Sequence, residues 1–327
     1  MPLLTRREAL RAAAALCCIP FAGCAAKSEQ RSTTLFCFDT VCTIAGVLSQ
    51  NTLDEACALC ERFEKLLSRT IPTSDVGRIN AARGTAVEVD AYTAELVQAA
   101  LRYCEESDGL FDITIGAVSE LWDFTEGVVP SEHAIAEALP HVGWRNVQVE
   151  GTSVKLLDPK ARIDLGGIAK GYIADAVVNL FRERGVTSAS VNLGGNVVVL
   201  GNKADGRPWN VGVRDPSDEG GSSVVAKVRT SGGSVVTSGL YERSFEHDGR
   251  RYWHILDPRT GYPVQTDVVS ATIYSQRSID GDGYTKPLFI WGAEKALRWL
   301  DAKPELQGLL VMSDGSIHTT SNSEFEF

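Results

Sequence analysis

The feature that most limits the possible folds is the series of short β-rich segments that follows Gly185. Glycines and polar residues separate these segments, and short connections of this kind favour antiparallel pairing between neighbours. The segments cover residues 189–193, 197–200, 209–213, 224–228 and 234–238, with two later ones at 268–274 and 309–312. The sequence therefore predicts an antiparallel sheet in the second half of the chain.

The first half of the chain is predicted to supply the helices that flank this sheet. Apolar residues recur at helical spacing over 53–67 and 91–106. The other elements expected here are an entry strand at 34–47, an irregular connection at 68–80, a short capped helix at 131–139, and a hairpin at 147–157 that turns at Gly151. No internal repeat or interdomain linker interrupts the sequence. We therefore expect one α+β domain over residues 33–327.

The charge balance argues against a nucleic-acid-binding surface. The chain has 327 residues and a formal net charge of −10. A protein that neutralises the phosphates of DNA or RNA carries a basic face, and no such face is visible in this sequence. We therefore expect no nucleic-acid partner.

The N-terminal segment is typical of bacterial export. Three arginines precede a short apolar run and then small residues that end at Cys24. Residues 1–23 are predicted to be a lipoprotein signal peptide, Cys24 the lipid-anchored first residue, and 24–32 a polar tether. The pair Arg6 and Arg7 leaves the export route open between the general and the twin-arginine pathway. We expect an exported protein anchored to the outer face of the bacterial cytoplasmic membrane.

Residues 162–175 are predicted to form a strand, a glycine turn and a helix. A short apolar run ends at Asp164, two glycines follow, and apolar residues then recur at helical spacing. Glycines before a helix let a ligand approach the free N–H groups of its first turn, where phosphate often binds. Lys170 adds a positive charge there, and Asp164 can hold a polar group of the same ligand. The alternative is an ordinary glycine turn with a solvated lysine.

Two further positions combine titratable side chains with turns. His254 and Asp257 straddle the end of a β-rich run, and the following Pro258 and Gly261 form a turn that would hold the two side chains near one place. A histidine in such a position is also commonly a satisfied core residue. Asp112 follows a glycine turn, and its favoured interpretation is a cap on a helix through residue 121, with a ligand-facing carboxylate as the alternative.

Taken together, these segments resemble the ApbE family of FAD:protein FMN transferases from about residue 38 to the end of the chain. The order of several short motifs carries the resemblance. They are Phe-Asp-Thr at 38–40, Gly-Leu-Phe-Asp-Ile-Thr-Ile-Gly at 109–116, Asp-Leu-Gly-Gly-Ile-Ala-Lys-Gly at 164–171, Asn-Leu-Gly-Gly at 192–195, Thr-Ser-Gly at 237–239, and His-Ile-Leu-Asp-Pro-Arg-Thr-Gly-Tyr-Pro at 254–263, with Asp282 ahead of Leu-Phe-Ile-Trp-Gly at 288–292.

The resemblance implies a reaction and a set of ligand-binding residues. The family cleaves FAD, joins FMN through a phosphoester to a Thr or Ser of a partner protein, and releases AMP. The implied partner is an exported electron-transfer protein with an FMN-binding domain. By this resemblance FAD is held by Leu110, Phe111, Asp112, Asp164, Lys170 and the backbone near Leu256. Mg²⁺ is bound by the Gly167 carbonyl and the Asp282 carboxylate, with help from Thr285.

Three positions depart from the family pattern. Phe38 stands where the family usually has Met, and Thr70 where an aromatic residue often covers the flavin. Lys286 stands where a metal-binding Thr is usual, four residues after Asp282. Two alternatives follow for that site: Thr285 replaces the missing ligand, or the Lys286 ammonium contacts the phosphate directly.

For the chemistry, His254 is our candidate for the base that takes the proton of the acceptor hydroxyl, with Asp257 as the group that orients it. Two other functions are compatible with the same sequence. One is an FAD pyrophosphatase that produces FMN and AMP with water as the nucleophile. The other is a flavin-binding lipoprotein without catalytic activity.

Overall fold

An antiparallel sheet of eight strands forms the centre of the computed structural model, which describes residues 29–218 and 220–327. Each strand in it runs antiparallel to its neighbours. In spatial order the strands are β1 (Gln30–Cys37), β2 (Thr40–Val47), β6 (Ala189–Leu193), β7 (Asn196–Leu200), β10 (Gly232–Gly239), β13 (Val268–Ser275), β14 (Gln307–Met312) and β15 (Ile317–Thr319). The predicted antiparallel sheet is confirmed.

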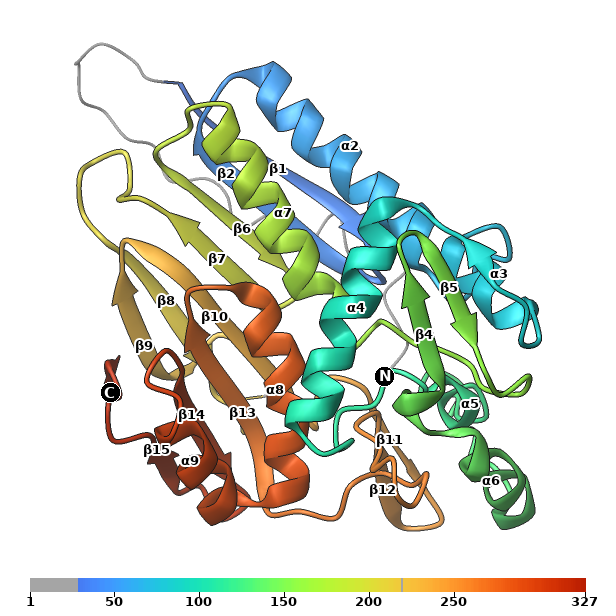
Figure 1. Cartoon of the computed structure of the whole chain (residues 1–327). Coiled ribbons are helices and arrows are strands. Elements are labelled where there is room, and N and C mark those ends of the chain that lie inside the picture. The colour runs from blue at the N-terminus through green and yellow to red at the C-terminus, as the bar shows by residue number, and fades with distance from the viewer. Residues whose placement is uncertain (1–28, 219) are drawn as a thin grey trace.

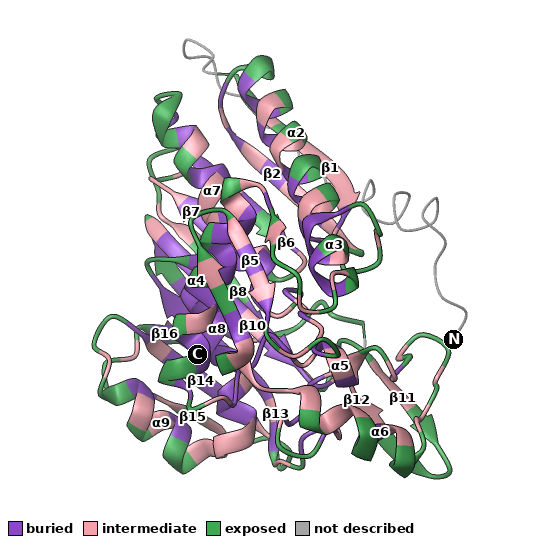
Figure 2. Ribbon diagram, turned by 45° about the vertical axis from the view of Figure 1, so that its right-hand side comes forward, coloured by how far each residue is buried: buried purple, intermediate pink, exposed green. Residues whose placement is uncertain are grey.

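Helices cover one face of this sheet (Figure 1). They are α2 (Gln50–Leu67), α4 (Ala91–Glu106), α7 (Ala169–Glu183) and α8 (Ser278–Trp291). The core between sheet and helices includes the fully buried rings of Phe63, Phe181 and Phe289. Buried residues gather along this interface in Figure 2. The predicted α+β class, a single domain with antiparallel strands flanked by helices, is confirmed.

Helix α8 lies unusually close to its neighbours because glycines face them. A Cβ at Gly281 would lie 2.5 Å from the Val236 side chain of β10, and one at Gly283 would lie 2.4 Å from the Tyr103 ring of α4. Side chains at these positions would force the helix outward. The glycines therefore bring the polar residues of α8, including Asp282, into the interior.

Smaller sheets surround this core. The sheet of β8 (Trp209–Arg214), β9 (Val224–Thr230) and β16 (Phe325–Glu326) packs on the other face of the main sheet through a cluster that includes Val199, Val213, Val228 and Leu309. The remaining elements are β3 (Val87–Glu88), α5 (Gly116–Ser119), α6 (Glu132–Ala138), η1 (Leu139–His141), η2 (Trp144–Asn146), β4 (Val147–Glu150), β5 (Ser153–Leu156), β11 (Ser244–His247), β12 (Arg250–Trp253) and α9 (Ala293–Asp301).

The N-terminal expectations are partly corrected. The single strand predicted at 34–47 is a hairpin of β1 and β2 that turns at Phe38 and Asp39, both with φ of 55°. Strand β1 begins at Gln30, so residues 30–32 of the predicted tether belong to the sheet. The predicted signal peptide 1–23 and Cys24 lie outside the described residues. None of the helices in the described ranges combines the length and apolar character that a membrane span requires.

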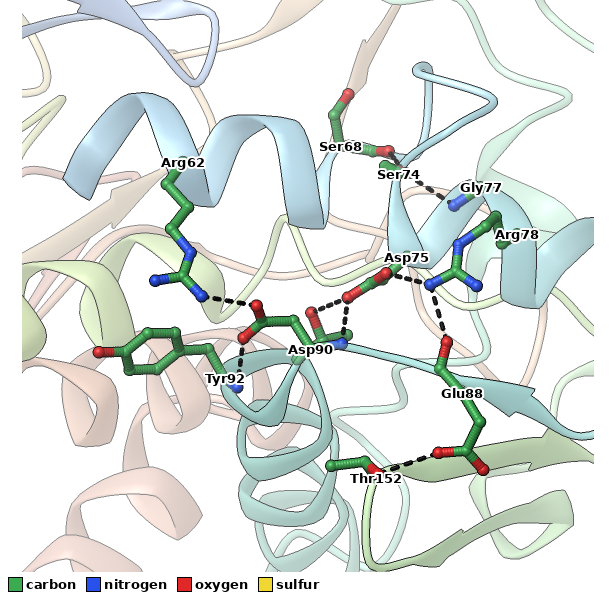
Figure 3. Close-up of polar contacts among 11 residues, drawn as sticks. Arg62, Ser68, Ser74, Asp75, Gly77, Arg78, Glu88, Asp90, Tyr92 and Thr152 are labelled. Carbon is green, nitrogen blue, oxygen red and sulfur yellow. Dashed lines mark hydrogen bonds and ion pairs between the residues drawn. The ribbon is translucent and has the colours of Figure 1, made fainter. Parts of the chain in front are cut away.

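The connection predicted as irregular at 68–80 contains helix α3 (Asp75–Ala81). Its first turn is capped by the Ser74 hydroxyl, which accepts the Gly77 N–H at 2.8 Å. The buried Asp75 carboxylate accepts hydrogen bonds from the Asp90 N–H and from the Thr93 hydroxyl at 2.8 and 2.7 Å, and it pairs with Arg78 (Figure 3). These contacts tie α3 to the start of α4 and fix the loop between α2 and α3.

Candidate active site

Two segments predicted to bind FAD, residues 109–116 and 162–171, lie side by side. The Asp164 N–H donates to the Ile113 carbonyl at 2.7 Å, and Ile115 forms an isolated parallel bridge with Arg162. A Cβ at Gly116 would lie 2.5 Å from the Arg162 carbonyl oxygen, so glycine is needed for this approach. The strand predicted before Asp164 is therefore only a bridge, whereas the helix predicted after it is α7.

The turn before α7 presents its backbone to solvent. Gly166 is exposed, although Leu165 and Ile168 on either side are buried. The Asp164 carboxylate holds the turn, because one oxygen accepts the Gly166 N–H at 2.8 Å. The Phe111 ring lies against Gly167, where an added Cβ would be 3.2 Å from the ring. A ligand can therefore reach this backbone from the solvent side.

Helices α7 and α8 meet at Gly171 and Asp282. The Gly171 N–H donates to Oδ2 of Asp282 at 2.6 Å, and the Asp282 side chain is only 1% exposed. Burial by itself raises the pKa of Asp282, but the charges of Lys286 and Lys170, together with this hydrogen bond, outweigh it and lower the pKa below its ordinary value. Asp282 is therefore a carboxylate in the folded protein.

Lys286 lies between this carboxylate and the glycine turn. Its Nζ is 3.3 Å from Oδ1 of Asp282 and 3.1 Å from the Asp282 carbonyl oxygen. Its Cε would be 3.9 Å from a Cβ built on Gly167. Burial lowers the pKa of Lys286, and the neighbouring Asp282 offsets part of that effect. The Thr285 hydroxyl is buried and bonds the Ser238 hydroxyl at 2.9 Å.

His254 follows β12 and lies near Lys286 and Lys170. Its backbone N–H donates to the Arg243 carbonyl at 3.0 Å, while its ring atom Nδ1 is buried and has no hydrogen-bond partner among the described residues. Burial and the positive charges of Arg243, Lys286 and Lys170 lower the pKa of His254 to about 3. The imidazole is therefore neutral near pH 7 and has a ring nitrogen available as an acceptor, and the low pKa makes it a weak base until an anionic ligand offsets the neighbouring positive charges.

The prediction that Asp257 orients His254 is wrong. Both carboxylate oxygens of Asp257 bind the guanidinium of Arg259, at 2.9 Å to Nε and 2.6 Å to a terminal nitrogen. One of these oxygens also accepts the Arg259 N–H at 2.9 Å. Arg259 is two residues away in the same turn, so the carboxylate hydrogen-bonds to Arg259 and not to the imidazole of His254. Leu256, on the same segment, is buried and bridges to Pro263.

The interpretation of Asp112 as a cap on the helix through residue 121 is also wrong. Its carboxylate accepts hydrogen bonds from the Thr114 N–H and hydroxyl at 2.7 and 2.6 Å, and from the Trp144 N–H at 3.0 Å. Helix α5 begins only at Gly116. Asp112 therefore joins the 110–116 segment to η2, and burial raises the pKa of its carboxyl group in spite of these donors.

The other predicted FAD positions lie around this centre. Phe38 occupies the turn between β1 and β2, where its N–H donates to Glu64 at 3.0 Å. Thr70 is exposed and bonds the Ser68 hydroxyl at 2.9 Å. Leu110 is buried next to Phe111. Their role in flavin binding stays a prediction.

The fold adds residues to the site that we did not predict from the sequence. Arg69, next to Thr70, pairs with Asp164 at 3.2 Å. Glu242 is open to solvent, yet the surrounding protein raises the pKa of its carboxyl group, and the charges of Lys170 and Lys286 offset only part of that effect. The one available signal for Glu242 was its place three residues after the Thr-Ser-Gly motif at 237–239.

Asp175 of α7 fixes the start of α8 and predicts a pH effect on stability. Its two oxygens accept the Ser278 and Ile279 N–H groups at 2.8 and 3.0 Å. Burial raises the pKa of Asp175 from 3.8 to about 6. Because the folded pKa is raised, this group stabilises the fold fully below pH 3.8, and that contribution is lost as the pH rises through 6.

We therefore expect the free energy of unfolding of the wild type to fall by roughly 2–3 kcal/mol relative to that of Asp175→Asn between about pH 4 and pH 7. Urea unfolding at several pH values measures this difference. Asp54→Asn, at an exposed position of α2, is the control and should give a curve parallel to that of the wild type. A constant difference between wild type and Asp175→Asn would contradict the prediction.

The fold and the site together define a single-domain α+β protein with a charged, partly open site where α7, α8 and the β12 turn meet. The chain belongs to the ApbE family, whose model matches residues 38–310. Proteins named FAD:protein FMN transferase from Treponema pallidum and Klebsiella pneumoniae are similar to it. The first is 38% identical over 82% of this chain and 79% of its own length, and the second 37% identical over 84% and 88%.

Solved structures agree with this assignment. The ApbE protein of Thermotoga maritima has a TM-score of 0.81 at 33% identity, and the alignment covers 90% of this chain and 97% of that one. The flavinyl transferase ApbE of Pseudomonas stutzeri has a TM-score of 0.80 at 28% identity, with 90% and 95% covered. The family resemblance found in the sequence is confirmed.

Proposed function

We propose that this chain is an FAD:protein FMN transferase that cleaves FAD, attaches FMN through a phosphoester to a Thr or Ser of a partner protein, and releases AMP. The supporting observation is the meeting of Lys170, Lys286 and the neutral His254 beside the exposed glycine turn. Two lysine ammonium groups beside an exposed turn suit a diphosphate, although the N–H groups of Gly166, Ala169 and Gly171 already donate to Asp164, Leu165 and Asp282. A neutral imidazole suits proton transfer from a hydroxyl group.

In the proposed reaction the acceptor oxygen attacks the phosphorus of the FMN half of FAD. A new P–O bond forms, the bond from that phosphorus to the bridging oxygen breaks, and AMP leaves with that oxygen. His254 takes the hydroxyl proton. Lys170 and Lys286 stabilise the charge that develops on the phosphate oxygens, so that most of the rate gain is electrostatic and positional. Asp164 keeps the glycine turn in its open form through Gly166.

The Mg²⁺ dependence predicted from the resemblance stays a prediction, with Asp282 as its carboxylate and Gly167 as its carbonyl. The residues present fit the ion only in part. One Asp282 oxygen accepts the Gly171 N–H, the other faces the Lys286 ammonium, and the Thr285 hydroxyl is taken by Ser238. When bound, Mg²⁺ would supply Lewis-acid charge to the diphosphate.

We also propose that the protein is exported and lipid-anchored, and that its acceptor is an exported electron-transfer protein. An exported acceptor with an FMN-binding domain suits a protein whose first residues are typical of a lipoprotein signal followed by Cys24. Labelling with a fatty acid in bacteria that express the full chain, compared with Cys24→Ser, measures lipidation directly.

One assay separates the three candidate functions. The protein is incubated with FAD, Mg²⁺ and a purified flavin-acceptor domain. We expect flavin fluorescence on the denatured acceptor together with free AMP. Free FMN and AMP with an unlabelled acceptor would instead identify an FAD pyrophosphatase, and intact FAD would identify a binding protein. A variant acceptor that lacks its Thr or Ser nucleophile is the control.

A further inference from the structure

Lys286 lies beside the glycine turn and contacts Asp282. It lies on α8 one turn after Asp282, and its side chain is 19% exposed. Its ammonium group has three N–H donors, and the described residues provide two acceptors, the carboxylate and the carbonyl oxygen of Asp282. One donor therefore remains for a ligand at the glycine turn.

The position of the ammonium also bears on metal binding. The Gly171 N–H donates to Oδ2 of Asp282, and the other oxygen, Oδ1, lies 3.3 Å from Nζ of Lys286. A divalent cation on that oxygen would stand next to a like charge, and this arrangement is strongly unfavourable in a buried site. An ion on that oxygen would require Lys286 to move, and the move would leave an ammonium without its carboxylate.

We propose that the Lys286 ammonium, paired with Asp282, takes the place of a divalent metal as the counter-charge of the FAD diphosphate, so that this chain binds FAD without metal. The inference rests on the proposed function. Asp282 holds the ammonium in place, and Lys170 supplies a second positive charge from the first turn of α7. Of the two alternatives that the sequence left open, the buried hydrogen bond of Thr285 to Ser238 favours direct contact by Lys286.

A different placement of Lys286 would allow a metal ion to bind Asp282. Lys286 could turn toward Glu242, whose charge also acts on it, and leave Asp282 to a metal ion. The two arrangements predict opposite effects of metal on FAD binding. The rival makes FAD binding depend on the metal and lets divalent ions bind the free protein tightly.

The test is FAD affinity, measured by fluorescence anisotropy in EDTA and in excess Mg²⁺. We expect the wild type to bind with the same affinity within about threefold in both. Lys286→Met should weaken binding in EDTA by roughly 10- to 100-fold, the loss expected for one charge-assisted hydrogen bond. Lys286→Arg should retain most of the affinity. Lys295→Met, at an exposed position of α9, should bind as the wild type does.

A second measurement follows the metal without flavin. Titration with Mn²⁺, observed by electron paramagnetic resonance, should give weak binding to the wild type. Lys286→Thr, which restores the hydroxyl of the family pattern, should bind at least 10-fold more tightly, because the like charge is gone. This readout stays informative if a variant loses activity.

Wild-type protein that binds FAD only with Mg²⁺ would overturn the inference and leave the transferase function intact. Equal Mn²⁺ affinity of the wild type and Lys286→Thr would overturn it as well. A wild type that binds FAD under neither condition would instead refute the proposed function, and the inference with it. Circular dichroism of each variant checks that it is folded.

Discussion

Replacement of His254 by asparagine is expected to lower the rate of FMN transfer by about 100-fold or more, the usual contribution of a positioned general base. Asparagine keeps a polar side chain at this position but cannot accept the proton of the acceptor hydroxyl at neutral pH. Because Lys170, Lys286 and the glycine turn are untouched, FAD should bind as it does to the wild type. Single-turnover labelling of the acceptor domain gives the rate, and anisotropy gives the affinity.

His247→Asn is the matched control, because His247 is an exposed histidine on β11 of the same hairpin region. It should transfer FMN at the rate of the wild type. Undiminished transfer by His254→Asn with normal FAD binding would remove His254 from the role of base. Loss of transfer in both variants would point to a hairpin contact with the acceptor instead of proton transfer.

Replacement of Gly171 by alanine is expected to destabilise the fold by about 3 kcal/mol and to abolish FMN transfer. The added Cβ would lie 2.5 Å from the Ser278 carbonyl oxygen and 2.7 Å from the Ile279 Cα, so α7 and α8 would have to separate. Backbone atoms cannot move aside as a flexible side chain can. The separation would also stretch the hydrogen bond from the Gly171 N–H to Asp282. Urea unfolding measures the loss of stability.

Gly232→Ala is the control for this prediction. A Cβ at Gly232 of β10 has no atom within 4 Å among the described residues, so the change should alter stability little. Equal stability of wild type and Gly171→Ala would show that the helices can separate at small cost. In that case the close packing of α7 on α8 would not be what positions Asp282.

Elements with a strong local signal were predicted well. Helix α4 spans the predicted residues 91–106, because its apolar residues recur at helical spacing and Asp90 caps its first turn. Strand β6 likewise covers the predicted 189–193. The hairpin at 147–157 turns at Gly151, which has a φ of 60°. In each case neighbours in the sequence supply the deciding interaction.

Elements without such a signal were missed. The turn between β1 and β2 places Phe38 and Asp39 at positive φ. Residues other than glycine rarely adopt this conformation, so the sequence did not indicate a turn there. Helix α3 was hidden by Gly77, which normally interrupts a helix. Glycine is required there because a Cβ would lie 2.4 Å from the Ile71 carbonyl oxygen. Tertiary contacts override local propensity at both places.

Two ion pairs in the site could have been predicted, since each joins residues close in sequence. Asp257 and Arg259 are two residues apart in a turn, and Asp282 and Lys286 are four apart on a helix, the spacing at which side chains meet. We predicted from the sequence that Asp257 lies beside His254 instead. Asp257 binds Arg259 because the guanidinium offers two parallel hydrogen bonds at short range.

The sequence by itself determined the α+β class, most of the strands, the family and the glycine turn with its lysine, because short-range periodicity and motif order encode them. Only the tertiary structure decided that Asp282 faces Gly171 across 111 residues, that Lys286 occupies the free side of that carboxylate, and that the half-buried His254 lies among positive charges. The reason is physical: burial and the distance between charges depend on the packing of α8 against α7 and β10. No local pattern records how closely two distant segments approach.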